Sequence, residues 1–214
     1  MRVSRLFPIL LLLTASVSAF AGEDVSKTVT AAPVIEDPFA RGASDVEFLG
    51  GYFHSPIATG GTHHPQFDFS GGDFRWDIVL TPMMFDHSNI FRGNLALLVD
   101  ALGYGVVHGP GNYLTGGSIL FRYNFLQPGS RVVPYFQLGG GGLHSDAAED
   151  QSQRIIGGNF EFILDADLGL RILLNDRWSL LLEGGFQHIS NADTASRNVG
   201  VNALGGRAGF AWSY

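Results

Sequence analysis

A histidine and a serine stand two residues apart near the end of the chain, at positions 188 and 190 of the segment FQHISNADTASRNVGVN. Residues at i and i+2 of a β-strand share one face, so the two side chains would lie together. A serine hydroxyl is a weak nucleophile until an imidazole accepts its proton, and a third group must hold the imidazole in one tautomer. Asn202 could hold His188, and Asn191 could donate a hydrogen bond to an oxyanion. These residue types predict ester hydrolysis.

The face that carries this pair is apolar. In the strand predicted over residues 177–190, the positions in phase with His188 and Ser190 are Trp178, Leu180, Leu182 and Phe186. Asn202 opens the strand predicted over 202–214, in the phase of Leu204, Phe210 and Trp212, and would lie beside His188 if the two strands form a hairpin. Polar groups on a lipid-facing wall are costly unless they sit near the interface or have partners. We therefore expect a site at the outer rim that acts on a lipid ester.

The elements that must position these residues are strands. Apolar and polar residues alternate from Asp45 to the end of the chain, as in Phe160 to Ile172, where the other face includes Glu161, Asp165 and Asp167. We predict an all-β fold, an eight-stranded antiparallel transmembrane β-barrel over residues 45–214. The predicted strands cover about 46–54, 74–84, 91–106, 114–126, 131–144, 158–173, 177–190 and 202–214.

A soluble β-sandwich also alternates, but its polar face meets bulk water and can be highly charged. Here the polar faces mix glycine, small residues and a few charges of both signs, which is typical of the packed interior of a small barrel. We expect Asp165 and Asp167 to be structural carboxylates beside Arg171, and not an acid–base pair. The same interior role is expected for Glu47, Arg75, Asp77, Asp100, Arg122, Glu161, Glu183 and Arg207.

The composition is that of an exported membrane protein. Only 15% of the 214 residues are charged, 45% are hydrophobic, and there is no cysteine. Arg2, Arg5, an apolar run and Ala19-Phe20-Ala21 predict a signal peptide over residues 1–21, and 22–44 are expected to form a flexible lead-in. The net charge of −7 argues against nucleic-acid binding.

The connections and aromatic residues suggest an orientation. The segments 55–73, 107–113, 145–157 and 191–201 are mostly long, whereas 85–90, 127–130 and 174–176 are short, as outer loops and periplasmic turns are in bacterial barrels. Both termini would then be periplasmic. Aromatic residues near strand ends are expected in the two interfacial girdles; they are Trp76, Tyr104, Tyr113, Trp178, Trp212 and Tyr214.

HISNA, followed by Asn198-x-Gly200 and a polar residue at 202, resembles the C-terminal signature of the lipid A 3-O-deacylase (PagL-like) family. The resemblance implies an eight-stranded barrel in the outer membrane of a Gram-negative bacterium, with lipid A or lipopolysaccharide as substrate, His188 as general base and Ser190 as nucleophile. The family has a glutamate as the third triad member, and its spacing from the histidine maps onto Asn202. An asparagine can orient a histidine but cannot stabilise an imidazolium by charge.

Other interpretations remain beside this one. The departure at Asn202 favours a non-catalytic barrel with a structural or surface-binding role. His63-His64 in the first outer loop could bind a metal, but adjacent histidines on a loop are weak grounds for a metal site, and we expect no cofactor. The run Gly139 to Gly142 precedes no helix, so it is expected to mark a bulge or close packing and not a phosphate loop.

Overall fold

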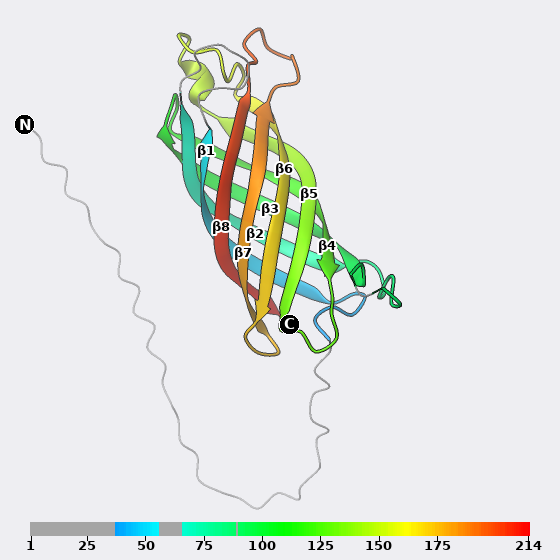
Figure 1. Cartoon of the computed structure of the whole chain (residues 1–214). Coiled ribbons are helices and arrows are strands. Elements are labelled where there is room, and N and C mark those ends of the chain that lie inside the picture. The colour runs from blue at the N-terminus through cyan, green and yellow to red at the C-terminus, as the bar shows by residue number, and fades with distance from the viewer. Residues whose placement is uncertain (1–36, 56–65, 89) are drawn as a thin grey trace, which may run out of the picture. The chain divides into compact units, whose positions relative to one another are not determined.

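The computed structural model describes residues 37–55, 66–88 and 90–214, and within them the chain forms a closed antiparallel barrel (Figure 1). Each strand pairs with its neighbours in sequence, and β1 closes the barrel against β8. The strands are β1 (Ser44–Ser55), β2 (Phe67–Val79), β3 (Gly93–His108), β4 (Tyr113–Phe125), β5 (Val132–Ser145), β6 (Phe160–Leu173), β7 (Trp178–Ser190) and β8 (Val201–Ser213), with a short 3₁₀ helix, η1 (Ala147–Glu149).

The two faces of the strands are the predicted ones. Phe121, Phe162, Leu164 and Leu182 are 40–58% exposed on the outer wall, while all the charged residues expected inside are at most 7% exposed. A wall with this much exposed apolar surface suits a lipid environment. Among the described residues, no helix has the length and apolar character needed to cross a membrane.

Arginines and carboxylates fill the middle of the barrel. Arg207 contacts four carboxylates, those of Asp165 (2.7 Å), Asp167 (3.0 Å), Asp73 (3.1 Å) and Glu183 (3.3 Å). The predicted structural role of Asp165 and Asp167 agrees with these contacts, but the arginine that binds them is Arg207 and not Arg171. Arg171 instead binds Asp45 of β1, because barrel closure brings the first strand close to it.

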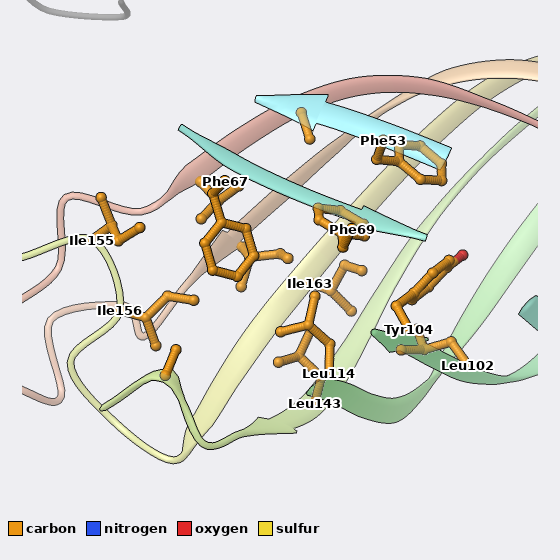
Figure 2. Close-up of a cluster of buried hydrophobic side chains, with 14 of the residues drawn as sticks. Phe53, Phe67, Phe69, Leu102, Tyr104, Leu114, Leu143, Ile155, Ile156 and Ile163 are labelled. Atoms are coloured by element: carbon orange, nitrogen blue, oxygen red, sulfur yellow. The ribbon is translucent and has the colours of Figure 1, made fainter. Parts of the chain in front are cut away.

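The interior changes character toward the end of the barrel that carries the 191–200 loop. There, aromatic and aliphatic side chains point inward and pack together, among them Phe53, Phe67, Phe69, Leu114 and Ile163 (Figure 2). This apolar layer explains why the second strand was predicted to start at 74. Phe67 and Phe69 lie on the same inward face as Asp73 and Arg75. The inward residues therefore change from apolar to charged at Gly71-Gly72, and the alternation in the sequence does not show that one strand runs through both parts.

Tyr104 also belongs to the interior, which corrects its assignment to a girdle. It is 3% exposed, and its hydroxyl donates to the Asp73 carboxylate at 2.7 Å. At the end of the barrel that carries the C-terminus, β2, β7 and β8 do have an aromatic row on the outer wall, because Val46 pairs with both Trp76 and Trp212, and Trp178 pairs with Trp212. Trp76 Nε1 donates to the Tyr214 hydroxyl at 3.0 Å.

The connections do not follow the predicted rhythm throughout. The β2–β3 connection covers residues 80–92, whereas the β3–β4 connection at the opposite end covers only 109–112. Residues 37–43, expected in the lead-in, form turns in which Phe39 is 8% exposed and packs with Leu126 and Val133. The predicted signal peptide and the possible metal site at His63-His64 lie outside the described residues.

The glycine run in β5 is a site of close strand approach. Its register with β4 and β6 is regular, so the alternative of a bulge is wrong. A Cβ atom at Gly141 would lie 1.9 Å from the carbonyl oxygen of Gly117. The one register shift in the described strands lies between β2 and β3, at Asp68 and Phe69.

Candidate active site

The final hairpin holds the predicted catalytic residues together. His188 on β7 and Asn202 on β8 are direct cross-strand partners, and Ser190 follows two residues after His188 on the same outward face. Figure 1 shows β7 and β8 side by side, joined by the 191–200 loop at the end of the barrel away from the C-terminus. Strand register and alternation therefore place all three side chains at one rim of the wall.

The three side chains form a hydrogen-bonded chain. His188 Nδ1 lies 2.7 Å from Asn202 Oδ1, and His188 Nε2 lies 3.0 Å from Ser190 Oγ. Because an amide oxygen only accepts, Nδ1 carries the proton and Nε2 presents its lone pair to the serine hydroxyl. This is the tautomer that a general base for Ser190 requires.

The polar chain is surrounded by apolar side chains on the outer wall. Ser190 pairs with Phe162 on β6, and His188 pairs with Leu164. Phe162, Leu164, Phe186 and Leu204 are 39–61% exposed, whereas His188, Ser190 and Asn202 are half-buried. At this rim, an ester that joins an acyl chain to a polar headgroup would have apolar side chains beside the acyl chain and polar side chains beside the headgroup.

The geometry does not support the predicted role of Asn191 as a hydrogen-bond donor to an oxyanion. Asn191 is fully buried, its Nδ2 donates to the Arg197 carbonyl at 2.9 Å, and its backbone N–H donates to Asn198 Oδ1 at 2.9 Å. The alternation of the strand could have predicted this, because the residue directly after Ser190 belongs to the opposite face. Asn191 instead ties down the loop that follows the site.

Gly200, the glycine of the Asn198-x-Gly200 motif, packs directly against the site. Its φ is +78°, and a Cβ there would lie 3.0 Å from the carbonyl oxygen of Ile189, 3.4 Å from His188 Cε1 and 3.5 Å from Ser190 Cβ. Just after the site, Ala192 and Asp193 also have positive φ values of 50° and 60°. Such backbone conformations cost free energy in non-glycine residues and require support from their surroundings.

That support comes from the neighbouring β5–β6 loop. Arg197 donates to the carbonyls of Ala148 (2.8 Å), Asp150 (2.8 Å) and Gln153 (3.0 Å). The backbone of Gly200 also donates to the Ile155 carbonyl at 2.9 Å. Sequence analysis missed Arg197, because its partners are backbone atoms of a loop more than 40 residues away.

Within the described ranges, no three histidine or acidic side chains gather in a way that could hold a metal ion. The side chains that the structure brings together at this rim are a hydroxyl, an imidazole and an amide.

The comparisons with known proteins bear on the same residues. The family model of the lipid A 3-O-deacylase (PagL) matches residues 66–211. The crystal structure of the outer membrane enzyme PagL is similar, with a TM-score of 0.50 and 18% identity over 78% of this chain and 98% of that one.

Other outer-membrane barrels are similar in fold. Neisserial surface protein A gives a TM-score of 0.47 and 14% identity over 80% of this chain and 96% of that one. The N-terminal barrel domain of Pseudomonas aeruginosa OprF gives 0.44 and 17%, over 81% and 98%. No curated protein matches the chain. Because the family model matches residues 66–211, which are most of the chain, the chain belongs to the lipid A 3-O-deacylase (PagL) family and is a β-barrel of the Gram-negative outer membrane.

Proposed function

We propose that this protein hydrolyses an ester-linked acyl chain of lipid A in the outer leaflet, with Ser190 as nucleophile, His188 as general base and Asn202 as the group that orients His188. The observation that carries the proposal is the continuous chain from Ser190 Oγ to His188 Nε2 (3.0 Å) and from His188 Nδ1 to Asn202 Oδ1 (2.7 Å). Family membership supplies the substrate class.

The steps follow from the positions of the protons. Ser190 Oγ attacks the ester carbonyl carbon as its proton passes to His188 Nε2, forming a tetrahedral oxyanion. Collapse of that intermediate breaks the bond to the sugar oxygen, which leaves with the proton held by His188. Water then attacks the acyl-serine, giving a proton to His188 and releasing the fatty acid, and the proton returns to Ser190.

Asn202 limits this mechanism in a defined way. Its amide oxygen fixes the His188 tautomer as a carboxylate would, so the ring is ready to accept a proton. It has no negative charge to stabilise the imidazolium that forms in the first step. We therefore expect turnover no faster than at an otherwise identical site with a carboxylate at residue 202.

The apolar side chains around the site support a substrate that stays in the membrane. Phe162 and Leu164 on β6 flank Ser190 and His188, and Leu204 on β8 follows Asn202 on the same face. An acyl chain lying along these side chains would keep its apolar contacts while its ester reaches the rim. The substrate would not need to leave the lipid phase.

The test is mass spectrometry of lipid A from cells that produce each variant. The wild type should remove one ester-linked acyl chain, and Ser190→Ala or His188→Ala should abolish this loss, because members of a triad fail together. Ser70→Ala is the matched control: Ser70 is also exposed on the outer wall, but its hydroxyl donates to the Gly51 carbonyl at 2.9 Å. Unchanged lipid A with folded wild-type protein would contradict the proposal.

The second candidate is a barrel without catalytic activity, serving a structural or surface-binding role. The observation that favours it is the uncharged amide of Asn202 at the position of the family's glutamate. If neither the wild type nor Asn202→Glu alters lipid A while both are folded in the membrane, this second function replaces the first.

A further inference from the structure

A second polar cluster lies on the outer wall, on strands β1 to β3. Its centre is the carboxylate of Asp68, whose side chain is fully buried although it belongs to the outward face. Tyr52 OH donates to it at 2.9 Å, His54 Nδ1 lies 2.8 Å away and His108 Nδ1 lies 3.2 Å away. The backbone N–H of Ser55 (3.3 Å) and the amide of Gln66 complete the set.

These contacts use the carboxylate fully. A carboxylate offers about four lone-pair positions, and five donors converge on Asp68, so it has no capacity left for a cation. Because a carboxylate only accepts, both imidazoles point an Nδ1–H at it. Their Nε2 atoms then lie on the side of each ring away from the carboxylate, and no hydrogen bond to them is found within the described residues. The side chains of His54 and His108 are 49% and 61% exposed.

The cluster and the candidate active site occupy the same part of the wall. His54 pairs with Leu204 on β8, and Leu204 lies two residues from Asn202 on the same face. His54 and His188 are two strands apart around the wall and two residues apart along it, which corresponds to roughly 12 Å at about 4.8 Å per strand and 3.4 Å per residue. A phosphorylated disaccharide headgroup is large enough to contact both places at once.

We propose that His54 and His108, held by Asp68, bind a phosphate monoester of lipid A through their Nε2 atoms. This inference rests on the proposed function for its substrate class, and it adds a headgroup site on β1 to β3 to the ester site on β7 and β8.

The chemistry of the pair suits a phosphate monoester. A protonated imidazole donates Nε2–H to a phosphate oxygen, and a neutral imidazole accepts the proton of a phosphate monoanion. The monoanion of a phosphate monoester keeps one proton that it can donate to Nε2, and the dianion can accept one from Nε2–H. An ionised phosphodiester has no proton to donate, so the pair should prefer monoesters to phosphodiester lipids.

Few other ionisable groups of the described residues face the two rings. On β1 and β2 they are Tyr52 and Asp68, which are part of the cluster. The facing residue of β8 is Leu204, and the first residue of β4 on the far side is Tyr113.

Another exposed histidine of the rim, on β5, offers a matched control. His144 on β5 is also exposed and contacts the hydroxyl of Tyr113 through Nδ1 at 3.2 Å, with the two rings stacked at 5.8 Å. Among the described residues no carboxylate holds this histidine, and β6 lies between it and the candidate active site. Replacing His144 should leave phosphate recognition unchanged.

The test uses His54→Asn and His108→Asn, singly and together, in full-length protein that also carries Ser190→Ala to prevent turnover. An asparagine amide can replace Nδ1–H toward Asp68 while removing Nε2, so the cluster should keep its internal contacts. The measurement is the Kd for diphosphoryl lipid A, for lipid A with both phosphates removed, and for phosphatidylglycerol, in detergent micelles. Gel mobility of unheated samples checks that each barrel is folded.

We expect the double variant to raise the Kd for diphosphoryl lipid A about tenfold, or about 1.4 kcal/mol. The Kd for dephosphorylated lipid A should not change, and His144→Asn should have no effect on either. If the double variant lost affinity for phosphatidylglycerol and kept its affinity for diphosphoryl lipid A, the monoester assignment would be wrong. Equal affinity of the folded wild type and double variant for diphosphoryl lipid A would overturn the proposal.

Activity then separates this inference from the proposed function. In the protein with Ser190 intact, the double variant should raise KM for diphosphoryl lipid A with little change in kcat, if the phosphate belongs to the substrate. An unchanged KM would assign the bound monoester to a neighbouring lipid A molecule, with the binding result intact. If the protein with Ser190 intact shows no deacylase activity, the Kd measurements still decide whether His54 and His108 bind the phosphate.

Discussion

His188 and Asn202 face each other across the last hairpin, and their side chains are joined by a 2.7 Å contact between Nδ1 and Oδ1. This contact depends on strand register and not on the conformation of a loop. The orienting half of the candidate triad is thus built into the barrel wall, and the loop from 191 to 200 packs against it through Gly200. Substitutions at residue 202 should therefore change the chemistry without changing the fold.

The first prediction concerns the charge at residue 202. Asn202→Glu should raise the deacylation rate or leave it equal, because a carboxylate stabilises His188 as it takes the proton. Asn202→Ala should lower the rate, but less than Ser190→Ala, because it removes orientation and not the nucleophile. The measurement is initial rate on purified lipid A, with thermal stability as a control. A lower rate for a folded Asn202→Glu protein would contradict the assignment.

The second prediction concerns Gly200. Gly200→Ala must place a side chain in the left-handed region, at about 1–2 kcal/mol, and set a Cβ close to the ring of His188. We expect at least a tenfold fall in kcat with a small loss of stability. Gly129→Ala is the control, since Gly129 also has a positive φ, of 74°, but lies in a turn at the other end of the barrel with open space around it. Equal kcat in both variants would refute a positioning role for Gly200.

The third prediction concerns the interior ion network. Arg207→Ala should cost about 3–5 kcal/mol of unfolding free energy, because it leaves four buried carboxylates without their shared cation. Urea titration in detergent, followed by the mobility of the folded band, measures the loss. Arg177→Ala removes an exposed arginine and should be neutral within about 0.5 kcal/mol. A neutral Arg207→Ala would mean that the network does not support the barrel.

The fourth prediction concerns orientation. The chain has no cysteine, so single cysteines can be introduced without background. Ser196→Cys in the 191–200 loop should react with a membrane-impermeant maleimide on intact cells, and Asp176→Cys between β6 and β7 should react only after the outer membrane is opened. Both positions are exposed, so accessibility of the side chain does not distinguish them. The reverse pattern would place the candidate active site in the periplasmic leaflet.

The sequence by itself determined the outer wall and the place of the candidate site. Alternation is a local property, set by the pleat of each strand, so the phase of Leu182 and Phe186 was enough to assign His188 and Ser190 to the lipid face. The same phase in the last strand assigned Asn202. A hairpin then needs only a register to bring Asn202 beside His188, and no distant part of the chain is involved.

Only the tertiary structure decided which interior residues pair and where the interior becomes apolar. The partner of Asp165 and Asp167 is Arg207 and not the nearby Arg171, because interior side chains choose partners across a closed barrel and not along one strand. Closure also creates an apolar layer, which reverses the pattern of Phe67 and Phe69 and draws Tyr104 inward. The grouping of His54 and His108 around Asp68 has the same origin, since three strands must pair in register, with a shift at Asp68, before the three side chains can meet.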